Sequence, residues 1–258
     1  MTTLDTRKVS INFGGLWAVK DVDFSINARE IVGLIGPNGS GKTTFLNIIS
    51  GIYPATNGTV TLQGENITGL RPFEIFKKGI ARTYQSSRLC WDLSVADNVL
   101  MGLYTKQKAS FLDILIHPQK TNNEIYECLQ ECMDVLSYFN PALFNRRYDL
   151  ARDIPHIDRR RIEISRALVG RPTLLLLDEP TAGLNDEETM RMMDDIHKIK
   201  EKIKDICIII IEHDMKVMER VTERIVVFNA GQKIAEGTYR EVISDANVVK
   251  AYLGGSTV

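Results

Sequence analysis

Residues 36–44 read Gly36-Pro37-Asn38-Gly39-Ser40-Gly41-Lys42-Thr43-Thr44, and this stretch decides the fold. It fits the phosphate-binding pattern G-x-x-x-x-G-K-[ST]. The apolar run 31–35 before it is typical of a strand, and residues 45–50 after it are typical of a helix that ends at Gly51. Strand, glycine-rich turn and helix is the order that the pattern requires, so the stretch is predicted to bind nucleotide phosphates.

The residue types in this loop have a direct physical purpose. Glycines let the backbone turn sharply, so that successive N–H groups point at one anion. The following helix presents the positive end of its dipole to the same anion. Lys42 adds a cation for the outer phosphates, and the Thr43 hydroxyl is a ligand for Mg²⁺. An ordinary tight turn is the alternative, but it would have no need of the Lys42-Thr43 pair.

Length and composition set the class of protein. The 258 residues are enough for one large domain, or for a domain with a subdomain, and 44% are hydrophobic. A net charge of -1 gives no support to general nucleic-acid binding, and the basic run 159–161 reads as a solvated surface. The four cysteines include Cys128 and Cys132, one helical turn apart, but no second Cys or His pair completes a metal site. Reduced thiols are therefore expected.

The N-terminus lacks the design of a signal peptide, and the longest apolar runs, 174–177 and 206–211, are too short to cross a bilayer. The chain is expected to stay in the cytosol unless a partner holds it on a membrane.

Strands and helices alternate along the chain, which predicts an α/β fold with a mostly parallel sheet. A block from about 86 to 169 with helical spacing interrupts this alternation and is predicted to be an inserted helical subdomain. Strands are predicted at 9–13, 22–26, 30–35, 59–62, 80–84, 173–177, 206–211 and 224–228, with a final hairpin strand at 231–237. Helices are predicted at 72–78, 94–104, 119–138, 157–169, 187–202 and 215–221, followed by two short helices that end at Leu253.

Two carboxylates end the apolar strand at 174–177. The C-terminal end of such a strand is where α/β sheets bind ligands. Asp178 is placed to hold Mg²⁺, directly or through water, and Glu179 is placed to polarise a water for attack on the γ-phosphate. A turn or helix cap is the alternative for this pair, and it is weakened by the phosphate loop.

Two further polar residues end strands of the same predicted sheet. His213 follows the apolar run 208–211 and is placed to sense or polarise the γ-phosphate. Gln85 follows the strand at 80–84 and is placed to meet Mg²⁺ or the attacking water. Each residue alone would read as an ordinary polar side chain.

These pieces, in this order, resemble the ATP-binding subunits of ABC transporters over essentially the whole chain. The phosphate loop is similar to the Walker A motif of that family, and 174–179 to its Walker B motif with the catalytic glutamate. Gln85 sits like the Q-loop glutamine and His213 like the switch histidine, while Asn185 replaces the usual aspartate of the D-loop. Phe13 lies where the family stacks an aromatic ring on adenine; generic core packing is the alternative for this residue.

The resemblance implies one ATP-binding domain over 1–258, with a P-loop NTPase core, an antiparallel β subdomain and the helical subdomain at about 86–169. It implies ATP and Mg²⁺ as ligands. The implied partners are integral-membrane permease subunits, a second ATP-binding subunit in a homo- or heterodimer and, indirectly, a periplasmic solute-binding protein. Nucleic acid is not an implied partner. The chain would then lie on the cytoplasmic face of the cell membrane. The implied catalytic residues are Glu179, His213 and Gln85, the implied metal ligands Thr43, Gln85 and Asp178, and the implied nucleotide contacts Phe13, Gly36, Pro37, Asn38, Gly39, Ser40, Gly41, Lys42, Thr43 and Thr44.

More closely, the chain resembles the ATPase subunits of branched-chain or hydrophobic amino-acid uptake systems. The sequence segments that carry this resemblance are 13–16, 81–85, 211–215 and 251–254. An importer of urea or short amides, and a regulatory subunit that binds ATP with little hydrolysis, remain as alternatives. An ABC ATPase that acts on nucleic acid or ribosomes is disfavoured by the neutral charge, and a small-molecule kinase or GTPase would not need Gln85, Glu179 and His213 in this order.

One motif departs from the family. Where ABC ATPases have Leu-Ser-Gly-Gly-Gln, this chain has Ile154-Pro155-His156-Ile157-Asp158. That signature caps the γ-phosphate of ATP bound to the other subunit of a head-to-tail dimer, through a serine hydroxyl, backbone N–H groups and a helix N-terminus. Pro155 removes an N–H group and Ile157 adds a branched side chain where backbone would approach phosphate. We therefore expect asymmetry: a complete Walker site in this chain, and a weaker site where this chain completes that of its partner.

Overall fold

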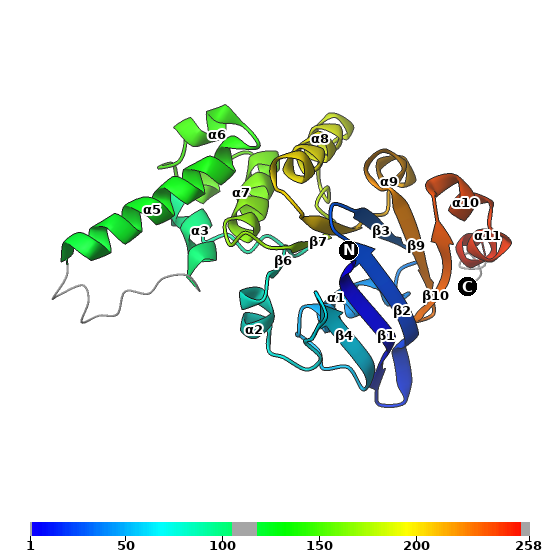
Figure 1. Cartoon of the computed structure of the whole chain (residues 1–258). Helices are drawn as coiled ribbons and strands as arrows, with labels where there is room; N and C mark the ends of the chain where they lie inside the picture. Colours follow the sequence, from blue (N-terminus) through cyan, green and yellow to red (C-terminus); the bar gives the residue numbers. More distant parts are fainter. Residues whose placement is uncertain (1, 105–117, 254–258) are drawn as a thin grey trace. The chain divides into compact units, whose positions relative to one another are not determined.

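A computed structural model describes residues 2–104 and 118–253 of the chain (Figure 1). These residues form two compact units, one built from the chain up to Gln85 with Thr173–Gly183 and the chain from Ile203 onward, the other from Ser86–Pro172 and Leu184–Lys202. Parts of two predictions lie outside the described residues: 105–117 of the helical block, and Gly254 of the segment 251–254. The prediction of one ATP-binding domain with helical bounds at about 86–169 stays a prediction.

An antiparallel sheet in the first unit has the strand order β2-β1-β4-β5. Its strands are β1 (Thr2–Phe13), β2 (Leu16–Asn27), β4 (Asn57–Leu62) and β5 (Glu65–Asn66). From Val22 to Asn27, buried and exposed side chains alternate in β2, which leaves one face of this sheet for the core and the other for solvent.

The second sheet of this unit has the order β10-β9-β3-β8-β7-β6 and is parallel except for the pair β9–β10. Its strands are β3 (Ile31–Ile35), β6 (Ile80–Arg82), β7 (Leu174–Asp178), β8 (Cys207–Ile211), β9 (Arg224–Asn229) and β10 (Gln232–Gly237). Every residue of β3, β7 and β8 is buried, as expected for parallel strands that are covered on both faces. The C-terminal ends of β3, β7 and β8 therefore meet at one edge of the sheet.

Helix α1 (Lys42–Ile49) packs between the two sheets and fixes the loop that precedes it. The Phe45 ring lies 5.6 Å from that of Phe24 on β2 and 5.3 Å from that of Phe228 on β9, between ring centroids. The other helices of the unit are α2 (Pro72–Lys77), α9 (Met215–Val221), α10 (Tyr239–Ser244) and α11 (Ala246–Leu253). Because α1 is held on both sides, the start of this helix is a rigid platform.

The second unit is helical in its described part. It contains α3 (Val95–Leu100), α5 (Pro118–Ser137), α6 (Pro141–Asn145), α7 (His156–Leu168) and α8 (Asp186–Lys202), with 3₁₀ turns at Met101–Leu103 and Ala151–Asp153. A buried ion pair joins α7 to α8, in which Arg161 Nη2 lies 2.7 Å from Asp195 Oδ2. The expectation of a solvated surface for the basic run 159–161 is therefore wrong for Arg160 and Arg161, which are both buried.

The structure differs from the predicted elements in a few places. The first strand begins at Thr2, whereas the sequence predicted a start at residue 9. The strand is irregular between these points: the register shifts between Thr6 and Val9, and Lys8 has a φ of 47°. Such a bulge breaks the alternation by which a strand is read from sequence. Strand β6 ends at Arg82, two residues before its predicted end, and the five-residue helix α6 was not predicted.

Candidate functional site

The phosphate loop joins the buried strand β3 to α1, which begins at Lys42. Gly36 has a φ of 145°, and a Cβ atom there would lie 2.1 Å from the backbone oxygen of Phe228. Gly41 has a φ of 105°, and its Cβ atom would lie 2.5 Å from the backbone oxygen of Ala18. Only glycine can adopt these backbone angles and also leave room for the neighbouring backbone oxygens. The neighbouring strands therefore restrict the shape of the loop.

A hollow of about 160 Å³ lies over this loop. Its lining residues are Ala18, Asn38, Gly39, Ser40, Gly41, Lys42, Thr43, Thr44, Glu179 and His213. Gly39 and Thr43 are exposed, and Lys42 is buried with its ammonium donating to the backbone oxygens of Gly36 at 2.8 Å and Pro37 at 3.1 Å. The loop therefore surrounds a small polar space beside the start of a helix, where an anion is favoured.

The electrostatics of Lys42 match this arrangement. Burial lowers the pKa of Lys42 below its usual value, while the nearby negative charges of Glu179 and Asp178 oppose that effect. An ammonium that is already partly removed from water gives up less hydration when it meets phosphate oxygens.

The Glu179 carboxylate is held between two side chains that the sequence had singled out. Gln85 Nε2 donates to Glu179 Oε2 at 2.6 Å, and His213 Nε2 lies 2.7 Å from Glu179 Oε1. Glu179 has a φ of 50°, and its backbone N–H donates to Ile211 at the end of β8. The structure thus brings Gln85, Glu179 and His213 together, although they are far apart in the sequence.

Asp178 is buried and paired with a residue that sequence reasoning did not assign to the site. Arg82 Nη2 donates to Asp178 Oδ2 at 2.7 Å, and the two side chains are 4% and 5% exposed. Arg82 is the last residue of β6 and pairs in register with Leu176, two residues before Asp178. This pair could have been predicted once β6 was placed beside β7, because Arg82 is then a cation next to a strand that ends in the carboxylate of Asp178.

Glu212, next to His213, is also part of the framework. Its Oε1 accepts hydrogen bonds from the Thr181 backbone N–H at 2.8 Å and the Thr181 hydroxyl at 2.6 Å. Burial raises the pKa of Glu212 above its usual value, against the opposing effect of these hydrogen bonds. This contact ties the turn after Glu179 to the end of β8.

These residues fit a nucleoside triphosphate with Mg²⁺. The open space at Gly39 and the helix start at Lys42 suit phosphate oxygens, and the exposed hydroxyl of Thr43 and the carboxylate of Asp178 are hard oxygen ligands. Among residues 2–104 and 118–253, no cluster of three or more His, Cys, Asp or Glu side chains forms a metal cage. One carboxylate and one hydroxyl suit the usual mode of Mg²⁺, which binds one or two protein ligands together with substrate phosphates.

Three remaining predicted residues or motifs lie in different surroundings. Phe13 is 45% exposed, and its ring lies 5.3 Å from that of Tyr53, edge to face. In the helical unit, Asn185 caps α8 through Oδ1, which accepts the Glu188 N–H at 2.9 Å. The altered signature forms the start of α7, where Pro155 is the cap residue and makes no side-chain cap hydrogen bond.

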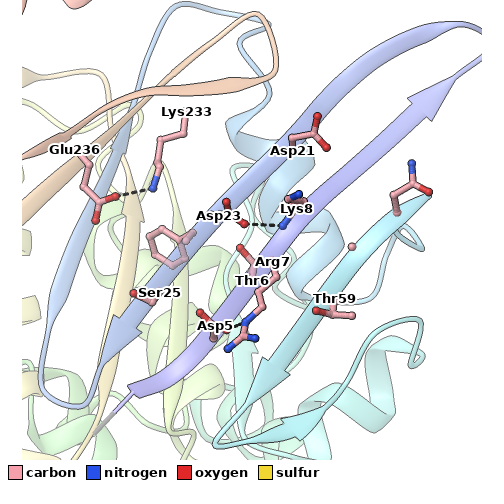
Figure 2. A pocket seen from close by; sticks show the side chains of 13 residues that line it. Asp5, Thr6, Arg7, Lys8, Asp21, Asp23, Ser25, Thr59, Lys233 and Glu236 are labelled. Carbon is pink, nitrogen blue, oxygen red and sulfur yellow. Dashed lines mark hydrogen bonds and ion pairs between the residues drawn. The ribbon is translucent and has the colours of Figure 1, made fainter.

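A second, larger hollow lies away from the phosphate loop, over the antiparallel sheet. Its volume is about 930 Å³, and Figure 2 shows its side chains, which come from β1, β2, β4 and β10. Two of its carboxylates have partners within it: Asp23 Oδ1 accepts the backbone N–H of Lys8 at 2.7 Å, and Glu236 Oε2 lies 2.7 Å from Lys233 Nζ (Figure 2). No residue of the phosphate loop lines this larger hollow, so its volume alone does not make it the nucleotide site.

Comparisons with known families agree with this geometry. The ABC transporter family model matches residues 19–182. A second model, described as branched-chain amino acid ATP-binding cassette transporter, matches residues 232–257. Two solved structures, a nucleotide-free ATP-binding cassette and the ADP conformation of a cassette, each have a TM-score of 0.84, at 28% and 29% identity. Each match covers 98% of this chain and 99% of the other.

Curated relatives are similar along almost the whole chain. The high-affinity branched-chain amino acid transport ATP-binding protein BraF of Pseudomonas aeruginosa is 35% identical over 254 residues, covering 97% of each chain. The protein LivG of Salmonella typhimurium, with the same description, is 36% identical over 251 residues and also covers 97% of each. The chain belongs to the ABC transporter family, as an ATP-binding cassette of the branched-chain amino acid transport type.

Proposed function

We propose that this chain binds and hydrolyses ATP to power the uptake of branched-chain or other hydrophobic amino acids. The observation that carries this proposal is the position of Glu179, held by Gln85 and His213 beside the hollow of the phosphate loop. A subunit that only bound ATP would have no need of a positioned base. The solute is supported by the descriptions of the relatives and by the matched segment 232–257.

Each group of the site has a chemical role. The amides of residues 36–44 and the Lys42 ammonium hold the phosphates and stabilise the charge that develops on them. Glu179 accepts the proton of the attacking water, and Gln85 orients that water. His213 contacts the γ-phosphate, and the exposed Phe13 ring stacks on adenine.

Thr43, Asp178 and Gln85 hold Mg²⁺ in this proposal. The ion, when bound, supplies positive charge that neutralises the phosphate oxygens. The protein contributes ligands whose positions are fixed before the nucleotide arrives, because Asp178 is buried at the end of β7 and Thr43 lies in the first turn of α1.

The proposal also includes partners. The cassette pairs with a second ATP-binding subunit and drives integral-membrane permease subunits at the cytoplasmic face, with a periplasmic binding protein supplying solute. No helix in the described ranges 2–104 and 118–253 has the length and apolarity of a membrane span.

The start of α7 supports unequal ATP sites in that assembly. Ile157 is 7% exposed, so its branched side chain packs inward at the second residue of the helix. Asp158 Oδ1 lies 2.8 Å from Arg161 Nη1, which places a carboxylate in the first turn, where a phosphate would otherwise be favoured. We infer that the site completed by this α7 hydrolyses ATP slowly.

Uptake and ATPase assays of the whole membrane complex test the proposed function. The Glu179→Gln complex should bind ATP but lose nearly all hydrolysis and leucine uptake, and undiminished turnover would remove the assignment of the base. Excess unlabelled isoleucine should compete with labelled leucine, whereas excess urea or acetamide should not. Competition by urea alone would assign the importer to short amides instead.

The signature inference has its own variant. The double change Pro155→Ser with Ile157→Gly restores two features of the usual motif, and it should raise the ATPase rate of the complex. No change in rate would contradict the inference of unequal sites while leaving the role of Glu179 untouched.

A further inference from the structure

Arg82 belongs to the segment 81–85 that carries the family resemblance, but none of the roles described above is assigned to it. Its guanidinium lies at the edge of the parallel sheet, 4% exposed, against the carboxylate of Asp178, which is 5% exposed. Burying two charges costs hydration that their attraction only partly restores, so such a pair is weak evidence for stability alone. An apolar pair of similar size would suit a core at least as well. The pair therefore calls for another explanation.

The other end of the guanidinium binds the helix of the phosphate loop. Arg82 Nη1 donates to Asn47 Oδ1 at 2.7 Å and to Ser50 Oγ at 3.0 Å, at the C-terminal end of α1. The Ser50 hydroxyl in turn donates to the backbone oxygen of Leu46 at 2.7 Å. One planar group thus joins the end of β7 to α1, whose first residue is Lys42.

Geometry limits what Arg82 does to Asp178. Arg82 Nη2 contacts Oδ2, whereas Nη1 contacts α1, so Oδ1 is the oxygen of Asp178 that is left to meet a metal ion. Arg82 Nε is buried and, within the described residues, has no hydrogen-bond partner. The polar contacts of the buried Arg82 side chain are therefore those of its two Nη atoms, and its Nε is an unsatisfied donor.

The same short segment reaches the second carboxylate. Three residues after Arg82, Gln85 Nε2 donates to Glu179 Oε2, so residues 82–85 contact both acidic groups at the end of β7. Arg82 is the buried end of this segment and Gln85 is its exposed end. If Gln85 moves when nucleotide binds, the chain would therefore move relative to Arg82, which is held by its buried contacts.

We propose that Arg82 is a positioning residue, which holds Asp178 in the orientation that receives Mg²⁺ and keeps it in register with the phosphate loop through α1. The inference rests on the proposed function, because it assumes that Mg²⁺ accompanies the nucleotide. It predicts a defect in the Mg²⁺ requirement that is separate from nucleotide binding itself, since Arg82 contacts neither the loop amides nor Lys42.

The test uses the purified full chain and a fluorescent ATP analogue, titrated first with a chelator present and then with increasing Mg²⁺. Arg82→Lys keeps the charge but cannot bridge Asp178 and Asn47 as a fork does. Its affinity for the analogue in chelator should equal that of the wild type. Its half-saturating Mg²⁺ concentration should rise about tenfold or more, the usual effect of losing a partner of a metal ligand. An unchanged Mg²⁺ requirement would overturn the proposal and leave Arg82 as a structural ion pair.

Two further variants make the result decisive. Asn47→Leu removes the anchor on α1 while leaving the Arg82–Asp178 pair, and it should shift the Mg²⁺ requirement in the same direction by a smaller factor. If Arg82→Lys does not fold, an unchanged requirement in Asn47→Leu overturns the proposal. Arg7→Lys is the matched control, because Arg7 pairs with Asp5 at 2.9 Å but is 81% exposed. A wild type that binds no analogue at any Mg²⁺ concentration would overturn the proposed function, and the inference with it.

Discussion

At the scale of single residues, the site depends on carboxylates in different surroundings at the same sheet edge. Glu179 meets Gln85 and His213 at the hollow, whereas Asp178 is buried against Arg82. Glu212 is buried as well, but it accepts hydrogen bonds from Thr181 rather than from a cation. The consequence is that substitutions of the three groups remove different contacts.

Glu212 gives a pH prediction. Because burial raises the folded-state pKa of Glu212, its contribution to stability is fully present below the unfolded pKa of about 4.3 and is lost as pH rises through the folded value. Glu212→Gln stays neutral throughout. The melting temperature of this variant minus that of the wild type, both measured by scanning calorimetry, should therefore increase as pH rises from about 4 to about 7. A difference that is constant with pH would contradict the assignment.

The cysteines give a second prediction at this scale. Burial raises the pKa of Cys132 and of Cys207 to about 12, so their reactive thiolates are rare at neutral pH. Cys90 and Cys128 are partly exposed. Mass spectrometry after brief treatment of the folded chain with iodoacetamide should find Cys132 and Cys207 unmodified, and all four cysteines modified after unfolding. Rapid labelling of Cys207 in the folded chain would show that β8 is less well packed than described.

At the scale of elements, the sequence predicts the parallel strands well because they are continuous apolar runs between turns. Strands β7, β8 and β9 lie within one residue of their predicted ends. The first part of β1 was missed because its bulge at Lys8 interrupts the alternation. The phosphate loop has a local spacing that can be read directly, and the carboxylates, Gln85 and His213 were singled out because each follows a predicted strand and their order resembles that of the ABC family. Arg82 was not, because a lone arginine gives no pattern until β6 is placed beside β7.

The contact between α7 and α8 gives a prediction at this scale. Arg161 lies between Asp158 and Asp195, and the Asp195 side chain is 2% exposed. Asp195→Ala leaves a buried guanidinium without its main partner, so it should cost about 3 kcal/mol in free energy of unfolding, measured with urea. Asp149→Ala is the control, since Asp149 pairs with Arg146 at the surface and should cost less than about 1 kcal/mol. Equal costs would show that the buried pair contributes no more than an exposed one.

At the scale of the whole molecule, the residues proposed to bind and hydrolyse ATP belong to one unit and the altered signature belongs to the other. Lys42, Gln85, Glu179 and His213 all lie in the unit that contains both sheets, and His156 begins a helix of the second unit. A cassette with this division can keep its own nucleotide site intact while its signature changes. The whole-chain net charge of -1 adds no general attraction for phosphates, so that attraction has to come from local groups such as the loop amides and Lys42.

The claim that the phosphate loop binds Mg·ATP to drive uptake is tested by the affinity of the full chain for Mg·ATP after Lys42→Ala, with leucine uptake by the assembled complex recorded in parallel. The account predicts much weaker binding and no uptake, because the loop loses the cation that meets the outer phosphates, while the exposed control Lys20→Ala behaves as wild type. Wild-type affinity together with undiminished uptake in the Lys42→Ala complex would contradict it.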